Sequence, residues 1–341
     1  MVIAGAGRFG TLHARVWREA GASVVGLCDV DHRRLEEVSR QMSVEHVSDE
    51  LEPLIRQVEP DAVLITSDEG THVKLTLEAL NSGRHVFVEK PLAMSSDDAW
   101  RVFGAAREAR RQVVAGQISR FAAPYARMRT TVESGRIGAL CALRLRRDFS
   151  RDWFLSFGER VHPVWESCIH DIDLAVSFVG RPVLRVMAMQ SEAAADAAPS
   201  VVSALLEFEG GVIATVESAW LVPQSAPQTL AGALALDGSI VGQMDVLGLE
   251  GLLRQRLVND SIVEWTKAGS VVPDLSLWPE EDGHIGGALR QEVEYAIGVF
   301  TGRRQPERVP LAEVCWGVAA AEAVVNSLQS GKPIDVGPGL E

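Results

Sequence analysis

The segment Glu89-Lys90-Pro91 places a lysine where it could take part in proton transfer. It follows the apolar run Val86–Val88, which predicts a strand, and a lysine at the carboxyl end of a parallel strand points into the ligand crevice. There its ammonium group can hydrogen-bond a substrate hydroxyl and stabilise the negative charge that develops on that oxygen. A lone lysine is usually a solvated surface residue, and the position at a strand end argues against that interpretation.

A second segment brings a histidine and two carboxylates onto one face of a predicted helix. Glu166 lies four residues before His170, and Asp173 lies three residues after it, so both neighbour the imidazole. A carboxylate beside a histidine fixes its tautomer and stabilises the imidazolium, as a general base requires. From spacing alone an exposed polar helix face is an equally good interpretation. A zinc site is disfavoured because no third ligand cluster accompanies the pair, so we expect no metal.

The glycine-rich loop Gly5-Ala6-Gly7-Arg8-Phe9-Gly10 follows the apolar run at residues 1–4 and is typical of a dinucleotide site. Gly5 permits the tight turn, Gly7 lets backbone amides approach a pyrophosphate, and Gly10 lets the helix pack on the strand. A glycine triplet alone is a weak signal. Here an amphipathic helix follows it, and an aspartate ends the next strand roughly 20 residues further on.

That aspartate, Asp29, lies where a carboxylate accepts hydrogen bonds from the adenosine ribose, which favours NAD over NADP. Arg33 and Arg34 follow closely and could serve a 2′-phosphate instead, so NADP stays open. The loop after the third long strand also borders the ligand crevice. The remaining predicted cofactor contacts are Thr66, Ser67, His72, Glu89 and Lys90, of which the first three are equally well explained as turn residues or helix caps.

Alternating strands and helices position these residues in the first third of the chain. The pattern predicts an α/β Rossmann domain with a parallel sheet, residues 1–118, that binds NAD(P). Strands are predicted at 2–4, 24–28, 62–66, 86–88 and 113–116, and helices at 9–20, 32–42, 50–58, 72–82 and 96–110. Ser95 or Ser96 can cap the last of these helices, and Gly21 and Gly83 lie just past helix ends.

Residues 119–341 predict an α+β domain for substrate binding and oligomerisation, with a large, mostly antiparallel open sheet. Gly210-Gly211 between two strand signals indicates a hairpin. Helices are predicted at 124–134, 164–179, 286–301 and 311–329, and strands at 183–190, 201–209, 212–220, 229–236, 239–247 and 250–267.

The composition narrows the choice of partners and of compartment. The 341 residues are 47% hydrophobic and carry a formal net charge of -13, which argues against nucleic acid and anionic membranes as main partners. The four cysteines are scattered, without metal or disulfide spacing. We read no apolar stretch as long enough to span a bilayer, and the first strand leaves no room for a leader. A cytoplasmic location is therefore expected.

Taken together, these motifs resemble the glucose–fructose oxidoreductase and inositol dehydrogenase family (Gfo/Idh/MocA), over nearly the whole chain. Glu89-Lys90-Pro91 is similar to its most specific motif, and His170–Asp173 is similar to its second. Further similarities are the glycine loop, Gln117, Arg120-Phe121 and Gly331-Lys332-Pro333. The resemblance implies that Lys90 and His170 are the catalytic pair, aided by the acidic residue at 166. It also implies a homodimer or homotetramer formed through the C-terminal sheet.

The chain departs from the family pattern in two places. The family usually has aspartate where this chain has Glu166, and glycines where it has His162-Pro163-Val164-Trp165. We expect the bulky Trp165 to alter the wall of the substrate site. The expected substrate contacts are Lys90, Arg120, Trp165, His170 and Asp173. Trp153 and Trp220 could also stack on a sugar ring, while Arg144, Arg146, Arg147 and Arg151 are better explained as a solvated strand face than as an anion site.

The sequence therefore predicts an NAD(P)-dependent oxidoreductase that interconverts a secondary alcohol and a ketone on a sugar, cyclitol or related polyol. Two other classes stay open at this point. One is a cofactor-dependent sensor that binds a sugar without turnover. The other is a glycosidase or lyase that uses NAD transiently and releases no net NADH.

Overall fold

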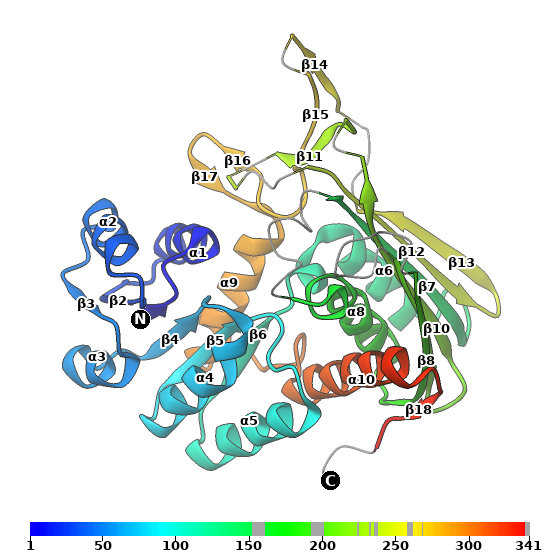
Figure 1. The fold of residues 1–341 in the computed structure, drawn as a ribbon, viewed down its shortest axis with the longest axis horizontal. Helices are drawn as coiled ribbons and strands as arrows, with labels where there is room; N and C mark the ends of the chain where they lie inside the picture. Colours follow the sequence, from blue (N-terminus) through cyan, green and yellow to red (C-terminus); the bar gives the residue numbers. More distant parts are fainter. Residues whose placement is uncertain are drawn as a thin grey trace.

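Two large β-sheets with helices packed between and around them make up the molecule (Figure 1). The structure is a computed structural model, and it describes residues 1–151, 161–191, 201–223, 225–231, 233–234, 238–257, 262–267 and 269–337. The six-stranded sheet lies on the left of Figure 1 and the seven-stranded sheet on the right. Both sheets that the sequence predicted are present.

The six-stranded sheet is parallel, with strand order β3-β2-β1-β4-β5-β6. Helices cover both of its faces, so its central strands are continuous apolar runs, as Ala62–Ile65 illustrates. The strands are β1 Val2–Ala4, β2 Gly26–Cys28, β3 His46–Ser48, β4 Ala62–Ile65, β5 His85–Glu89 and β6 Val113–Gly116. The helices are α1 Arg8–Glu19, α2 His32–Met42, α3 Leu51–Val58, α4 His72–Asn81 and α5 Ser96–Ala109. Two short elements of this half lie outside the predicted ranges, namely the edge strand β3 and the 3-10 turn η1 Glu69–Thr71.

Local capping explains where several of these helices begin and end. Ser95 is the N-cap of α5, and its side chain accepts a hydrogen bond from the Asp98 amide. Asp31 is the N-cap of α2, and its side chain accepts a hydrogen bond from the Arg34 amide. Gly21 and Gly83 have φ of 92° and 72°, the left-handed conformation predicted for the ends of α1 and α4.

The seven-stranded sheet has the order β13-β12-β7-β10-β9-β8-β18 and is antiparallel except for the β7–β10 pair. Its strands are β7 Leu140–Ser150, β8 Val183–Ser191, β9 Val201–Phe208, β10 Ile213–Val222, β12 Ile240–Gly248, β13 Gly251–Arg256 and β18 Ile334–Asp335. A small sheet holds β11 Gln228–Ala231, β14 Glu264–Thr266 and β15 Gly269–Pro273, and a hairpin holds β16 Glu280–Glu281 and β17 His284–Ile285.

Two strand predictions for this half need correction. Residues 250–267 do not form one strand, because β13 ends at Arg256 in the large sheet and β14 belongs to the small one. The predicted strand ranges also omit β7, which pairs with both β10 and β12, although its arginines were expected on a strand face. Three arginines, Arg144, Arg146 and Arg147, interrupt the apolar residues of β7, so no apolar run marks its bounds.

The second half also contains the helices that join the two sheets. They are η2 Ile118–Phe121, α6 Ala123–Glu133, the π-helical turn η3 Val164–Cys168, α8 Ile169–Val179, α9 Gly287–Phe300 and α10 Leu311–Ser330. The 20-residue α10, with a mean hydropathy of 1.3 in its most apolar window, is long and apolar enough to cross a membrane by length and composition. This corrects the expectation that no stretch reaches that length. In the fold, α10 packs against β8, α8 and α5.

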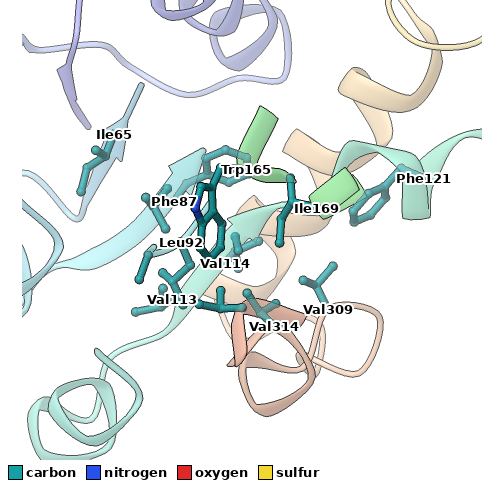
Figure 2. Packing of buried hydrophobic residues seen from close by; sticks show 14 of the residues in the cluster. Ile65, Phe87, Leu92, Val113, Val114, Phe121, Trp165, Ile169, Val309 and Val314 are labelled. Carbon is teal, nitrogen blue, oxygen red and sulfur yellow. The ribbon is translucent and has the colours of Figure 1, made fainter. Parts of the chain in front are cut away.

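A continuous apolar core connects the two halves beside β5 and β6 (Figure 2). Phe87 and Val114 come from the first sheet, Trp165 and Ile169 from the segment that opens α8, and Val314 from α10. All five side chains are buried. This packing fixes the segment 164–170, which carries Glu166 and His170, against the end of β5, which Lys90 directly follows.

Candidate functional site

A cleft of about 460 Å³ lies between the glycine loop and the inner face of the seven-stranded sheet. Residues from both halves of the chain line it, which is the arrangement that an enzyme with a bound cofactor and a separate substrate needs. Ten of the predicted site residues are among its lining: Gly7, Arg8, Phe9, Thr66, Ser67, His72, Glu89, Lys90, Glu166 and His170.

The glycine loop has the close backbone contacts that its sequence predicts. Gly5 has a φ of 104°, and a Cβ added to it would lie 2.5 Å from the Ser67 amide nitrogen. A Cβ on Gly10 would lie 2.0 Å from the Gly5 carbonyl oxygen, so a side chain at either position would displace backbone. A Cβ on Gly7 would meet no atom within 4 Å, because this glycine faces open space. The loop therefore fits a pyrophosphate at Gly7 and the N-terminus of α1.

Asp29 ties the end of β2 to this loop. Its Oδ2 accepts a hydrogen bond of 2.7 Å from the Ala6 amide, and its Oδ1 accepts one of 2.9 Å from the Asp31 amide. The Arg34 guanidinium lies 3.8 Å from the same carboxylate. Asp29 and Gly5 also line a second cavity of about 540 Å³ that shares Gly7, Thr66 and Ser67 with the cleft. A nucleotide can therefore extend from Asp29 past the glycine loop toward Lys90.

His72 holds two cofactor-side loops together. Its Nδ1 lies 2.7 Å from the Pro91 carbonyl oxygen and its Nε2 lies 3.0 Å from the Ser67 carbonyl oxygen. The ring is almost fully buried. Its contacts fix the loop after β4 beside the Glu89-Lys90-Pro91 segment.

Lys90 makes the contact that joins the two halves of the cleft. Its Nζ lies 2.8 Å from Glu166 Oε2 and 3.3 Å from the Glu166 carbonyl oxygen. Both side chains are 16% exposed, so the pair is partly shielded but open to the cleft. The ammonium is therefore aimed at the cleft rather than at bulk solvent.

Glu89 supports the lysine from behind. Its Oε2 accepts a hydrogen bond from the Lys90 amide, and its Oε1 lies 2.8 Å from Nε2 of the buried His13. Burial alone would raise the pKa of this carboxyl, but the contacts with His13 and Lys90 lower it below its ordinary value. Glu89 is thus held as a carboxylate that fixes the backbone at the end of β5.

His170 opens α8 and reaches the same cleft as a neutral ring. Burial and the nearby positive charges of Lys90 and Arg147 lower its pKa well below the ordinary value. Its Nδ1 is buried and has no hydrogen-bond partner among the residues that the structure describes. The nitrogen that can accept a proton from a ligand in the cleft is therefore Nε2.

The predicted carboxylate partners of His170 bond elsewhere. Glu166 bonds Lys90, as given above, and both oxygens of Asp173 accept hydrogen bonds from Arg120, at 2.7 and 2.8 Å. Arg120 also bonds Glu313 at 2.6 Å, and its side chain and that of Asp173 are each only 1% exposed. The structure thus places Arg120 and Asp173 in a buried ion pair that does not line the cleft. Helical spacing identifies Glu166 and Asp173 as neighbours of His170, but it does not reveal that Arg120 binds Asp173.

Trp165 and Trp220 lie in the core rather than on the wall of the cleft. Trp165 is 7% exposed and packs beside Phe87, Leu92 and Val114 (Figure 2). Trp220 is buried and donates a hydrogen bond of 2.6 Å to Ser167 Oγ. Trp153 lies outside the described residues. The bulky residue in place of the family's glycines therefore stiffens the junction between the halves.

Arg147 is the cleft residue that sequence reasoning misjudged. Instead of lying on a solvated face, its guanidinium is almost fully buried, lines the cleft and bonds both oxygens of Asp171, at 2.8 and 3.2 Å. The signal was present in the alternation of β7. Leu143, Leu145 and Arg147 all face inward, whereas Arg144 and Arg146 are exposed.

These observations define an NAD-binding oxidoreductase with a Rossmann half and a sheet half. Residues 1–117 match the model for the oxidoreductase family with an NAD-binding Rossmann fold, and residues 125–248 match that for the GFO/IDH/MocA C-terminal domain. The chain belongs to the GFO/IDH/MocA family of oxidoreductases.

Several similar proteins carry names of inositol dehydrogenases. The chain is 28% identical to myo-inositol 2-dehydrogenase of Thermotoga maritima over 225 residues, 63% of this chain and 67% of that protein. It is 31% identical to inositol 2-dehydrogenase of Rubrobacter xylanophilus over 194 residues, 54% of this chain and 53% of that one. These sequence matches thus span between about half and two thirds of the relatives' length.

Solved structures match the fold over nearly the whole chain. Myo-inositol 2-dehydrogenase from Lactobacillus plantarum superposes with a TM-score of 0.82 at 23% identity, covering 98% of each chain. Scyllo-inositol dehydrogenase from Lactobacillus casei, with bound NAD(H) and scyllo-inositol, superposes with a TM-score of 0.81 at 20% identity, again covering 98% of each chain. At sequence identities of 23% and 20%, this structural similarity establishes the fold alone.

Proposed function

We propose that this protein is an NAD-dependent dehydrogenase that interconverts a secondary alcohol and a ketone on a cyclitol, sugar or related polyol. The observation that carries the proposal is that Lys90 and His170, from different halves of the chain, line one cleft with the glycine loop. The names of the relatives, which are inositol dehydrogenases, support the choice of a polyol.

The cofactor site follows from the glycine loop and the second cavity. Gly7 and the first turn of α1 would hold the pyrophosphate, Asp29 the adenosine ribose, and Thr66 and Ser67 the part nearer the cleft. When bound, NAD supplies the acceptor for the hydride that an alcohol carbon gives up on oxidation.

The residues of this chain handle the proton and the oxygen. Lys90 donates a hydrogen bond to the reacting hydroxyl and stabilises the negative charge on its oxygen, while neutral His170 accepts the hydroxyl proton at Nε2. Glu166 holds the lysine ammonium at the cleft through its 2.8 Å contact. In ketone reduction the same imidazolium returns the proton to the oxygen.

The direct test is an absorbance assay for NADH with purified protein, NAD and a panel of cyclitols and sugars. We expect NADH and the matching ketone, detected by mass spectrometry, in equal amounts. Binding without NADH or product would indicate a sensor, and product without net NADH would indicate transient use of NAD. Either result would contradict the proposed dehydrogenase.

We also propose that the open face of the seven-stranded sheet pairs with a second copy of the chain in a homodimer or homotetramer. Leu205 on β9 is 46% exposed there, with Met187 and Thr215 as its cross-strand neighbours. Light scattering of the native protein and of Leu205→Lys tests this, because a charge on a self-complementary face weakens association. A cytoplasmic location remains our prediction from the composition.

A further inference from the structure

Around Lys90 and His170, each charged side chain that the structure describes in the cleft has a partner of opposite charge. Lys90 pairs with Glu166 at 2.8 Å, and Arg147 pairs with Asp171 through both carboxylate oxygens. His170 adds no charge, because its pKa lies well below the ordinary value. On the nucleotide side, Arg34 lies near Asp29 and Asp31, and Glu89 is held by His13. An anionic substrate would therefore find donors but no free cation among these residues.

The sheet side of the cleft is mainly apolar. Phe149 lies opposite Ile240 in the β7–β12 ladder, and Leu257 follows β13 and bonds the backbone of Gly242 on β12. All three side chains line the cleft and are buried. Of the described residues that this sheet contributes to the cleft, Arg147 alone is polar, and it lies two residues from Phe149 on the same face.

Loop residues extend the apolar surface toward the nucleotide half. Leu234 and Leu277 line the cleft, and Trp278 donates a hydrogen bond of 3.0 Å to the Leu234 carbonyl oxygen. Asp274 accepts hydrogen bonds from the amides of residues 276, 277 and 278, which fixes this loop. The cleft thus has a polar region at Lys90 and His170 and an apolar region bounded by β7, β12 and the loop before α9.

We propose that the substrate is an uncharged polyol ring that carries an apolar substituent, rather than a free polyol, a sugar acid or a sugar phosphate. This inference rests on the proposed function. The reacting hydroxyl lies at Lys90 and His170, and the substituent lies against Phe149, Ile240 and Leu257. A hydroxyl group placed against that wall would lose its hydrogen bonds to water and gain none from the protein. An aryl or alkyl group has no such hydrogen bonds to lose, and its apolar surface is buried there.

Calorimetry on the NADH-saturated protein tests the proposal, because an alcohol cannot be oxidised in that complex. The probes are matched pairs: phenyl and methyl β-D-glycosides of glucose, galactose and xylose, and 1-O-benzyl-myo-inositol with myo-inositol, plus glucuronate as the anion. We expect at least one aryl member to bind about tenfold or more tighter than its partner. Equal or weaker binding of every aryl member, tighter binding of glucuronate, or no binding at all would overturn the proposal.

Variants on one strand connect the preference to the apolar wall. Ile240→Thr should reduce the aryl preference severalfold. Val241→Thr is the matched control, since the neighbouring side chain is 45% exposed and does not line the cleft. If Ile240→Thr fails to fold, Leu234→Ser, at a half-buried position, measures the same effect. An unchanged aryl preference in the folded variants would contradict the assigned wall.

The assay for NADH separates this inference from the function on which it rests. Aryl-selective binding without NADH from any probe would refute the proposed dehydrogenase activity but would still support the assigned apolar wall. Oxidation of myo-inositol with the same kcat/KM as its benzyl ether would refute the proposed substrate class but would support the dehydrogenase activity.

Discussion

Glu166 Oε2 lies 2.8 Å from Lys90 Nζ, so the acidic residue four positions before His170 serves the lysine rather than the histidine. Lys90 directly follows β5 and Glu166 lies in the π-helical turn before α8, so their ion pair crosses the junction between the halves. The proton-transfer chemistry proposed here therefore depends on how the two halves are packed. A shift of the turn at 164–168 would move both Glu166 and His170 away from the lysine.

Replacing Lys90 should lower turnover by orders of magnitude and leave cofactor binding intact. Lys90→Ala removes the donor that stabilises charge on the reacting oxygen, and loss of one such donor typically lowers kcat by about 10²–10³. Turnover is followed by NADH absorbance and NADH binding by its fluorescence. Lys332→Ala, at an exposed lysine, is the control. Turnover of Lys90→Ala close to that of the unmodified protein would refute the assigned role.

The pH dependence of oxidation should reflect a histidine that is hard to protonate. His170 must be neutral to accept a proton, and burial together with Lys90 and Arg147 lowers its pKa well below the ordinary value. The group therefore stays neutral as the pH falls through 6.5, and kcat/KM for oxidation should decline only at lower pH. A profile of kcat/KM from pH 5 to 9 checks this. An acid limb centred at or above pH 6.5 would contradict it.

A variant of the neighbouring lysine tests the cause of that shift. Lys90→Met removes one positive charge beside His170 and keeps a side chain of similar length, so the pKa of His170 should rise. NMR titration of the His170 ring measures this without any need for activity. A pKa of His170 that does not move would leave burial and Arg147 as the whole cause.

The parallel sheet and the residues at its carboxyl edge could be predicted because both depend on local pattern. A strand buried on both faces is a continuous apolar run, and β1, β4 and β6 begin as predicted. The glycine loop is determined by backbone contacts that only glycine permits, as at Gly5 and Gly10. These features need no knowledge of distant partners.

The partners of the charged residues could not be predicted, because they are chosen by tertiary packing. Asp173 is adjacent to His170 on the helix, yet Arg120, 53 positions away in sequence, takes both of its oxygens. Trp165 has the size of a substrate wall, but its side chain is directed into the core between Phe87 and Val114. Arg147 was misjudged because an unpaired arginine is usually exposed, and its partner Asp171 comes from a helix that the sequence does not place beside β7.

Asp29 should determine the choice between NAD and NADP. Its carboxylate lines the cavity that would hold the adenosine ribose, and it repels a 2′-phosphate. Asp29→Asn removes this charge and leaves Arg34, 3.8 Å from the Asp29 carboxylate and 3.7 Å from that of Asp31, with one acidic neighbour fewer to compete with a phosphate. We expect the ratio of Kd for NADPH to Kd for NADH to fall about tenfold or more, measured by fluorescence titration. Asp31→Asn, which alters a neighbouring acid at the N-cap of α2, is the comparison.

A preference for NADPH in the unmodified protein, or an unchanged ratio in Asp29→Asn, would refute this role. An equal loss of affinity for both cofactors would show that Asp29 acts by fixing the glycine loop, since its oxygens also accept hydrogen bonds from the amides of Ala6 and Asp31.

The buried acid Glu292 should make the protein less stable as the pH rises. This α9 side chain is 0% exposed, and neither oxygen has a hydrogen-bond partner in the described part of the chain. Burial and the nearby carboxylates of Glu89 and Asp173 raise its pKa well above the ordinary value. Above about pH 4.3 the unfolded chain releases this proton while the folded protein keeps it, so the free energy of unfolding decreases as the pH rises.

Glu292→Gln keeps the shape of the side chain and removes its titration. The free energy of unfolding of this variant in urea should therefore exceed that of the unmodified protein by more than about 1 kcal/mol at pH 8, and by less at pH 5. Glu294→Gln, exposed on the same helix, should leave the pH dependence unchanged. Equal pH dependence in Glu292→Gln and the unmodified protein would mean that Glu292 is ionised in the fold, with a partner that offsets its burial.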